Sequence, residues 1–194
     1  MSFSGQFLPA STQIAVLLVL CLESGFCQGT VNFANAVNFA SSADRLVRDV
    51  TGVPLTGSNY FAQLYYGRLN APAESLVAVT AAPATFSLPG VGREGRWFGG
   101  MRTLTGFSDG QTVTLQVRVW DSAAGPTWEV AAQNGFAGTQ YGQSEVFSYS
   151  IPITGPPQAW FIENFRGFTL VPEPSVIGLA IIGAAVLLFV RRYK

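Results

Sequence analysis

The chain has 194 residues, of which only 11% are charged, and its 11 basic and 11 acidic side chains cancel. A chain without a basic surplus has no field to attract nucleic acid, so we expect no nucleic-acid partner. Histidine is absent, which removes the most frequent general base and the commonest zinc ligand. We therefore expect a protein that is not an enzyme and that holds no metal and no cofactor.

The first 27 residues are typical of a secretory signal peptide. Ile14–Leu22 is an apolar stretch of nine residues, which is long enough for the core of a signal peptide and too short to span a bilayer. No lysine or arginine precedes it, so only the amino terminus supplies positive charge. We expect cleavage before Gln28, with cleavage after Gly29 as the alternative. Cys21 and Cys27 are the only cysteines, so the mature protein would have no disulfide.

Residues 28–170 form one domain of short strands separated by Gly, Pro, Asn and Asp. Almost no helical periodicity is present, and Leu46–Val50 is the only stretch that we expect to form a helical turn. The pattern favours a mainly β fold, an antiparallel β-sandwich of jelly-roll type. The main expected strands lie within Thr30–Ala40, Tyr60–Arg68, Leu76–Thr80, Thr85–Leu88, Arg96–Thr105, Gln111–Asp121, Glu145–Ile153 and Ala159–Leu170.

The clearest strand, Gln111–Asp121, follows the turn dipeptide Asp109-Gly110. Its residues alternate strictly between an apolar and a more polar face. This alternation predicts a strand that buries one face only. The apolar face has Val113, Leu115, Val117 and Val119, and the other face has Thr112, Thr114, Gln116, Arg118 and Trp120.

Two kinds of side chain could carry chemistry in this domain. Paired carboxylates could make a glycoside hydrolase without histidine, but no spacing singles out two of the candidates. Flat aromatic rings could stack on sugars, and we single out Trp120, Trp97 and Trp128 for this role, although most aromatics in a sandwich pack in its core. The carboxylates considered are Asp109, Asp121, Glu129, Glu145 and Glu163.

The last 24 residues have three parts in unbroken order: a stiff polar prefix, an apolar run and a basic end. The prefix, Pro172-Glu173-Pro174, should be extended because proline disfavours helix in the residue before it. The run Val176–Val190 spans about 22 Å of a hydrocarbon core about 30 Å thick. Ser175 and Tyr193 extend the run at its two ends, so we expect a transmembrane helix over 175–193. A buried core helix is the alternative.

The basic end fixes the expected orientation. Arg191, Arg192 and Lys194 can reach the membrane interface and retain the tail there. Cationic flanks stay on the cytoplasmic side, so the domain before the tail should lie outside the cytoplasm. The expected organisation is a signal peptide at 1–27, an extracytoplasmic domain at 28–170 and a tail at 171–194.

The tail resembles the PEP-CTERM sorting signal of Gram-negative and related bacteria. The resemblance rests on Val171, Pro172, Glu173, Pro174 and Ser175, on the adjoining apolar run and on the terminal arginine pair. It implies recognition by an exosortase, a membrane protease that acts at or near the motif, and export of the mature protein. An ordinary C-terminal anchor with two incidental prolines is the alternative.

These features together predict an exported, single-pass protein of the cell surface or extracellular matrix with a non-catalytic body. The body would be periplasmic, or extracellular after processing, and the C-terminus cytoplasmic. Its expected partners are an exosortase-like protease and the lipid bilayer. An exopolysaccharide-binding module is the alternative function, and a secreted glycoside hydrolase is a third.

Overall fold

The structure is a computed structural model, and it describes residues 28–35, 43–135, 138–154, 156–157, 159 and 161–172. These residues form nine strands and few, short helical segments. The strands are β1 (Gln28–Ala34), β2 (Tyr60–Arg68), β3 (Val77–Ala78), β4 (Ala84–Thr85), β5 (Phe98–Ser108), β6 (Thr112–Asp121), β7 (Gln140–Gln143), β8 (Phe147–Ser150) and β9 (Val171–Pro172). The helical segments are the 3-10 turns η1 (Ala43–Arg45), η2 (Gly57–Asn59), η3 (Ala73–Ser75) and η4 (Ser122–Ala124), and the α-helix α2 (Trp128–Gln133).

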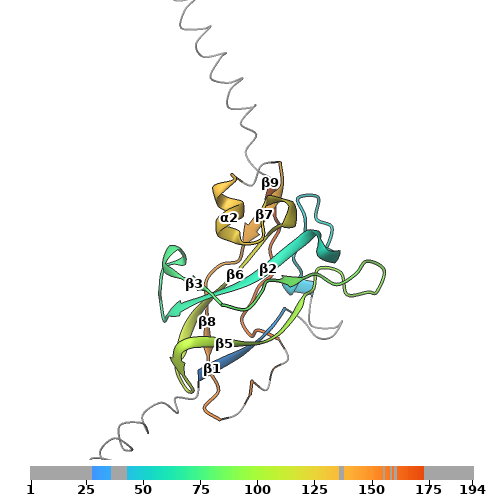
Figure 1. Cartoon of the computed structure of the whole chain (residues 1–194). Helices are drawn as coiled ribbons and strands as arrows, with labels where there is room; N and C mark the ends of the chain where they lie inside the picture. Colours follow the sequence, from blue (N-terminus) through green and yellow to red (C-terminus); the bar gives the residue numbers. More distant parts are fainter. Residues whose placement is uncertain are drawn as a thin grey trace, which may run out of the picture.

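The strands form two antiparallel sheets that contribute to one apolar core (Figure 1). The smaller sheet is the pair β1–β5. The larger sheet has the order β3-β2-β6-β7-β9, and in addition β4 pairs with β2 and β8 pairs with β6. The core takes Phe33 from β1, Leu104 from β5, Leu64 from β2 and Val117 from β6. The predicted class, mainly β with antiparallel sheets, is therefore confirmed.

The centre of the larger sheet is the pair β2–β6, with nine residue pairs in continuous register. The predicted strand Tyr60–Arg68 has the bounds of β2. Gly67, which interrupts the aromatic pattern of this stretch, stays in the strand and pairs with Thr114.

Both faces of β6 are buried, whereas the alternation of its residues predicts burial of one face. The four apolar residues of the predicted inner face are fully buried. On the other face Trp120 is 0% exposed and Gln116 is 2% exposed. Gln116 satisfies its side chain there by donating from Nε2 to the Ser144 carbonyl (3.0 Å). Helix α2 covers this end of the face through Ala131, which packs in the same cluster as Trp120.

The Asp109-Gly110 turn connects the two sheets instead of closing a hairpin. The backbone N–H of Gln111 donates to the Ser108 carbonyl (3.3 Å), and Gly110 has a φ of 79°. The strand before this turn, β5, pairs with β1, while the strand after it, β6, pairs with β2. The turn residues were therefore located correctly, but the sheets on either side of them differ.

The predicted strand Ala159–Leu170 is wrong: the described part of this range is irregular. Asn164 has a φ of 62°, which no strand tolerates, and Thr169 makes only an isolated bridge to Arg48. The apolar residues of the segment are nevertheless buried, with Ile162 and Phe165 at 0% exposure. The segment therefore fills the core as an ordered coil.

The two helical predictions also need correction. Leu46–Val50 is not helical, because its backbone groups bond to other segments: Val47 donates to the Gly95 carbonyl and Arg48 to the Phe168 carbonyl. Helix α2 was missed because six residues show no period. Its local signals are the N-cap Thr127, whose Oγ1 accepts from the Val130 N–H (3.3 Å), and Glu129 in the first turn.

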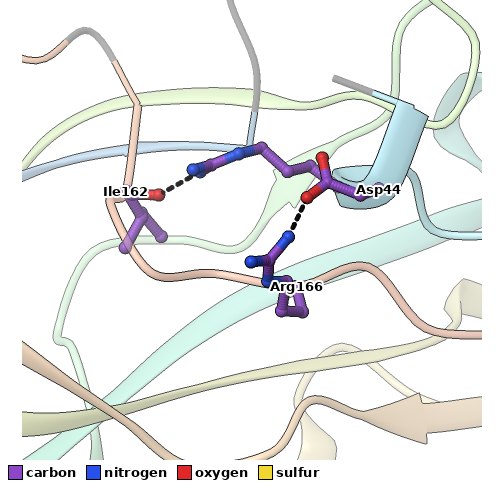
Figure 2. Close-up of polar contacts among 4 residues, drawn as sticks. Asp44, Ile162 and Arg166 are labelled. Atoms are coloured by element: carbon purple, nitrogen blue, oxygen red, sulfur yellow. Dashed lines mark hydrogen bonds and ion pairs between the residues drawn. The ribbon is translucent and has the colours of Figure 1, made fainter. Parts of the chain in front are cut away.

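The segment 43–48 is bonded at several points to the segment 162–170, and Figure 2 shows two of these contacts. Arg45 donates from Nη1 to the Ile162 carbonyl (2.7 Å), and Arg166 forms an exposed ion pair with Asp44. Backbone bonds continue the contact, from the Arg48 N–H to the Phe168 carbonyl (3.0 Å) and back from Leu170 to Arg48 (2.8 Å). The last of these bonds, at Leu170, directly precedes β9.

Several predictions concern residues outside the described ranges. These are the signal peptide at 1–27, the end of the predicted strand Thr30–Ala40 and the tail from 173 onward. Among the residues that the structure describes, no helix is both long and apolar enough to cross a membrane.

The close approach at Gly167 gives a test of this fold. A Cβ placed there would collide with the Leu46 carbonyl oxygen, and a backbone atom cannot rotate away. Gly167→Ala should therefore lower the free energy of unfolding by an amount toward the upper end of the roughly 1–3 kcal/mol typical of overpacking. The measurement is urea unfolding of the full chain followed by tryptophan fluorescence.

Gly142→Ala is the matched control for that substitution. The Cβ added at position 142 would meet only side-chain atoms of Leu170 and Phe168, at 3.1 Å or more, and these can shift. It should cost clearly less than Gly167→Ala. Equal costs for the two variants would contradict the close packing of 162–170 against 43–48.

Candidate functional site

Trp97 lies in the main core, 1% exposed, and cannot stack on a ligand in this fold. Its ring contacts three others, with centroid distances of 5.5 Å to Phe33, 5.6 Å to Phe86 and 5.4 Å to Phe165. Tilted and edge-to-face pairs of this kind stabilise a core beyond simple burial. The ring therefore joins β1, the segment after β4 and the C-terminal coil.

Trp120 is likewise withdrawn from solvent, although it lies on the more polar face of β6. It is 0% exposed, and its Nε1 donates to the Gly125 carbonyl (2.8 Å). Its ring centroid lies 5.8 Å from that of Phe61 and 6.2 Å from that of Trp128. The stacking role predicted for Trp120 and Trp97 is thus corrected, because tertiary packing occupies both faces that a sugar would need.

Trp128 is half-buried at the start of α2, so it is the one of the three predicted rings with exposed surface. The Arg118 guanidinium lies over this ring, 5.5 Å from its centroid, and over the Tyr65 ring at 4.0 Å. Arg118 is held in place by donating to the Ala73 carbonyl (2.7 Å) and to Gln116 Oε1 (3.0 Å). A ligand at Trp128 would therefore meet an aromatic edge beside a fixed cation.

Tyr65 connects this cluster to a carboxylate. The side chain is 2% exposed, and its hydroxyl donates to Glu129 Oε1 at 2.6 Å. Burial first, and then the hydrogen bond to Glu129 and its negative charge, raise the pKa of Tyr65 well above its ordinary value of 10.0. The neutral phenol is therefore the form that the fold favours.

A pocket of about 250 Å³ lies beside the Tyr65–Glu129 contact. Its walls are Gln63 and Tyr65 of β2, Thr127 and Glu129 at the start of α2, and the connection 78–83. Gln63 holds that connection in place by donating to the carbonyls of Val79 (2.8 Å) and Ala81 (3.1 Å). The volume is just below the range of about 300–1,000 Å³ usual for small-molecule sites, so only a small ligand fits.

The carboxylates considered for hydrolysis lie on separate elements. Asp109 precedes β6 and Asp121 ends it, so some ten residues of strand, about 30 Å, lie between them. The two acids of a glycosidase lie within about 10 Å of each other. Glu129 is on α2, Glu145 follows β7, and Glu163 is in the C-terminal coil. Within the described ranges, no group of three His, Cys, Asp or Glu side chains could hold a metal ion.

The predicted sorting motif begins inside the described domain. Val171 and Pro172 form β9, which pairs with Tyr141 and Gln140 of β7 at the edge of the larger sheet. The rest of the motif, 173–175, and the basic end, 191–194, lie outside the described residues. Sequence reasoning missed that the first two motif residues belong to the sheet, because a strand of two residues has no pattern.

The raised pKa of Tyr65 predicts a response to charge at Glu129. The stabilisation that the raised pKa of Tyr65 represents should be complete below about pH 10. It should be lost as pH rises through the higher folded-state pKa. Glu129→Gln should lower that pKa but leave it above the ordinary value, because burial is the larger cause. Phenolate absorbance against pH, compared with Tyr65→Phe to isolate this one tyrosine, is the measurement.

The control for this titration is Glu145→Gln, which removes an exposed carboxylate that does not contact Tyr65. It should leave the late-titrating phenol unchanged. A Tyr65 titration that is identical in the parent and in Glu129→Gln would show that the two side chains are not coupled.

Comparisons with known proteins add no relative to these observations. Neither the family models, nor the curated proteins, nor the solved structures contain a match to the chain. The resemblance of the tail to a PEP-CTERM signal therefore stays a prediction from the sequence.

Proposed function

We propose that this chain is an exported bacterial protein of the cell surface or extracellular matrix, sorted through its C-terminal tail. One observation carries the proposal: the stiff Pro-Glu-Pro prefix, the apolar run and the arginine pair follow one another without a gap at the end of the chain. An exosortase-like membrane protease would recognise the prefix while the apolar run lies in the bilayer. The body would be periplasmic at that stage, and extracellular or surface-bound after processing.

The domain before the tail supports this proposal in two ways. The last strand, β9, consists of the first two residues of the proposed motif, so the motif directly adjoins the edge of the larger sheet. The domain also contains no cysteine, so its stability does not depend on the redox state of the compartment. We infer a β-sandwich of jelly-roll type, since the two sheets share one core, and we propose a non-catalytic role for it.

Replacing Glu173 tests the sorting mechanism. Glu173→Ala removes the one charge of the prefix but leaves the apolar run intact, so membrane insertion should persist while processing is abolished. Intact mass of the protein recovered from membrane and medium, in cells with the matching protease, measures both. The same measurement locates the N-terminal cut.

Glu163→Ala is the control, because Glu163 is an exposed acid of the domain that precedes the tail. It should be processed like the parent. Normal processing of Glu173→Ala would count against the sorting assignment, and an ordinary anchor would then be the better description.

A second candidate function is binding of exopolysaccharide. The observation that favours it is the small pocket beside Glu129, where a carboxylate that can accept from sugar hydroxyls adjoins Tyr65. The half-buried Trp128 directly precedes Glu129 in the chain. The pocket would take one sugar unit of a neutral polymer, which suits a domain with few charges. This role would add a ligand to the sorted protein and would not replace the sorting function.

Retention on immobilised exopolysaccharide distinguishes this second role. The parent should be retained, and Glu129→Gln should bind at least about tenfold more weakly, since a hydrogen bond to a charged group contributes about 1.5–3 kcal/mol. Glu145→Gln should bind like the parent. If the parent is not retained, the carbohydrate role is excluded for that polymer and sorting is unaffected.

A further inference from the structure

Three exposed valines lie at the end of the domain that carries β9. Val53 is 57% exposed, Val171 49% and Val50 41%. The N–H of Val50 donates to Gln140 Oε1 (3.2 Å), and Gln140 pairs with Pro172 in the β7–β9 ladder. In Figure 1 this end carries β7, β9 and α2, whereas β1 and β5 lie at the other end.

In the loop 49–53, polar groups form hydrogen bonds within the loop, and the side chains of Val50 and Val53 are exposed. The Asp49 carboxylate accepts from the N–H (2.8 Å) and hydroxyl (2.7 Å) of Thr51 and from the N–H of Val53 (2.9 Å). The hydrogen bond from the Thr51 side chain is the main cause that lowers the pKa of Asp49. Arg48 donates to the Gly52 carbonyl (2.9 Å). One anion and one cation are thus held by loop atoms beside exposed apolar side chains.

The sequence between this end and the apolar run is short and contains proline. Only Glu173, Pro174 and Ser175 separate Pro172 from Val176. Four residues of extended chain reach about 13–14 Å at most, and proline keeps such a chain extended. The headgroup layer on each side of a bilayer is about 5–8 Å thick. With Val176 at the hydrocarbon boundary, the domain cannot lie far above the headgroups.

We propose that the surface formed by Val50, Val53 and Val171 docks on the lipid interface and places the sorting motif at the membrane. This inference rests on the proposed function, because it requires the tail to lie in the bilayer. Apolar side chains at such a surface gain by entering the boundary between headgroups and acyl chains. The partner is a lipid surface without a required net charge, because the local charges of the loop cancel.

The test uses the full chain in vesicles of phosphatidylcholine. With Cys21 and Cys27 replaced by serine no thiol remains, so single cysteines can carry a fluorophore. The variants are Val53→Cys on the proposed surface, Ile153→Cys as the matched control and Ala184→Cys in the apolar run. Ile153 is 79% exposed and adjoins Gly110 before β6, at the opposite end of that strand from Asp121.

Quenching by brominated lipids gives the depth of each fluorophore. At Val53→Cys, lipids brominated near the headgroup should quench the emission. They should leave Ile153→Cys unchanged, and lipids brominated near the acyl-chain ends should quench Ala184→Cys.

The other outcomes separate the two proposals. Quenching at Ala184→Cys with none at Val53→Cys would overturn the lipid-docking inference and leave sorting intact. No quenching at Ala184→Cys would overturn the proposed function itself. A change at Val53→Cys that follows protein concentration instead of lipid bromination would identify a second copy as the occupant and overturn the lipid assignment.

Discussion

The pairing of 43–48 with 162–170 is the constraint on which the rest of the structure depends. The C-terminal coil has no strand of its own before β9, so its backbone groups are satisfied by the segment that follows β1. Gly167 makes the contact possible, since any side chain there would collide with the Leu46 carbonyl. With the coil in this position, Phe165 packs against the Trp97 ring, and β9 pairs at the edge of the larger sheet.

Aromatic residues in this domain are used mainly for internal contacts. Trp97 and Trp120 each lie at the centre of a cluster of rings, on opposite faces of the larger sheet. The folded domain has no disulfides, so its stability depends on buried apolar surface. Large buried aromatic rings supply much of that surface. The rings of Trp97 and Trp120 are therefore not available to a ligand, whereas the pocket beside Glu129 presents polar groups.

Local pattern was sufficient for strands whose environment is set by their own residues. The period of two in β6 and the aromatic run of β2 located both strands to within a residue. Burial of the second face of β6 could not be predicted, because Gln116 depends on the distant Ser144 carbonyl and Trp120 packs with α2, which is too short to show a period. The strand prediction for 161–170 was wrong for a related reason. The apolar residues of this segment are spaced as in a strand, but its backbone hydrogen-bonds to a segment more than a hundred residues earlier. Of the candidate site, Glu129 and Trp128 were named from sequence, whereas Tyr65 was not singled out.

The bond from Asn32 Nδ2 to the Ala159 carbonyl joins residues 127 positions apart. Ribosomes add about 5–20 residues per second, so β1 waits roughly 6–25 s for that partner to be made. Strand β5, which pairs with β1, and Trp97, which packs on Phe33, are made within this interval, so the contacts of β1 with the C-terminal residues are the last to form. A nascent chain with such a delay is a natural client for chaperones that shield apolar segments, and its completion coincides with the arrival of the residues that lead into β9.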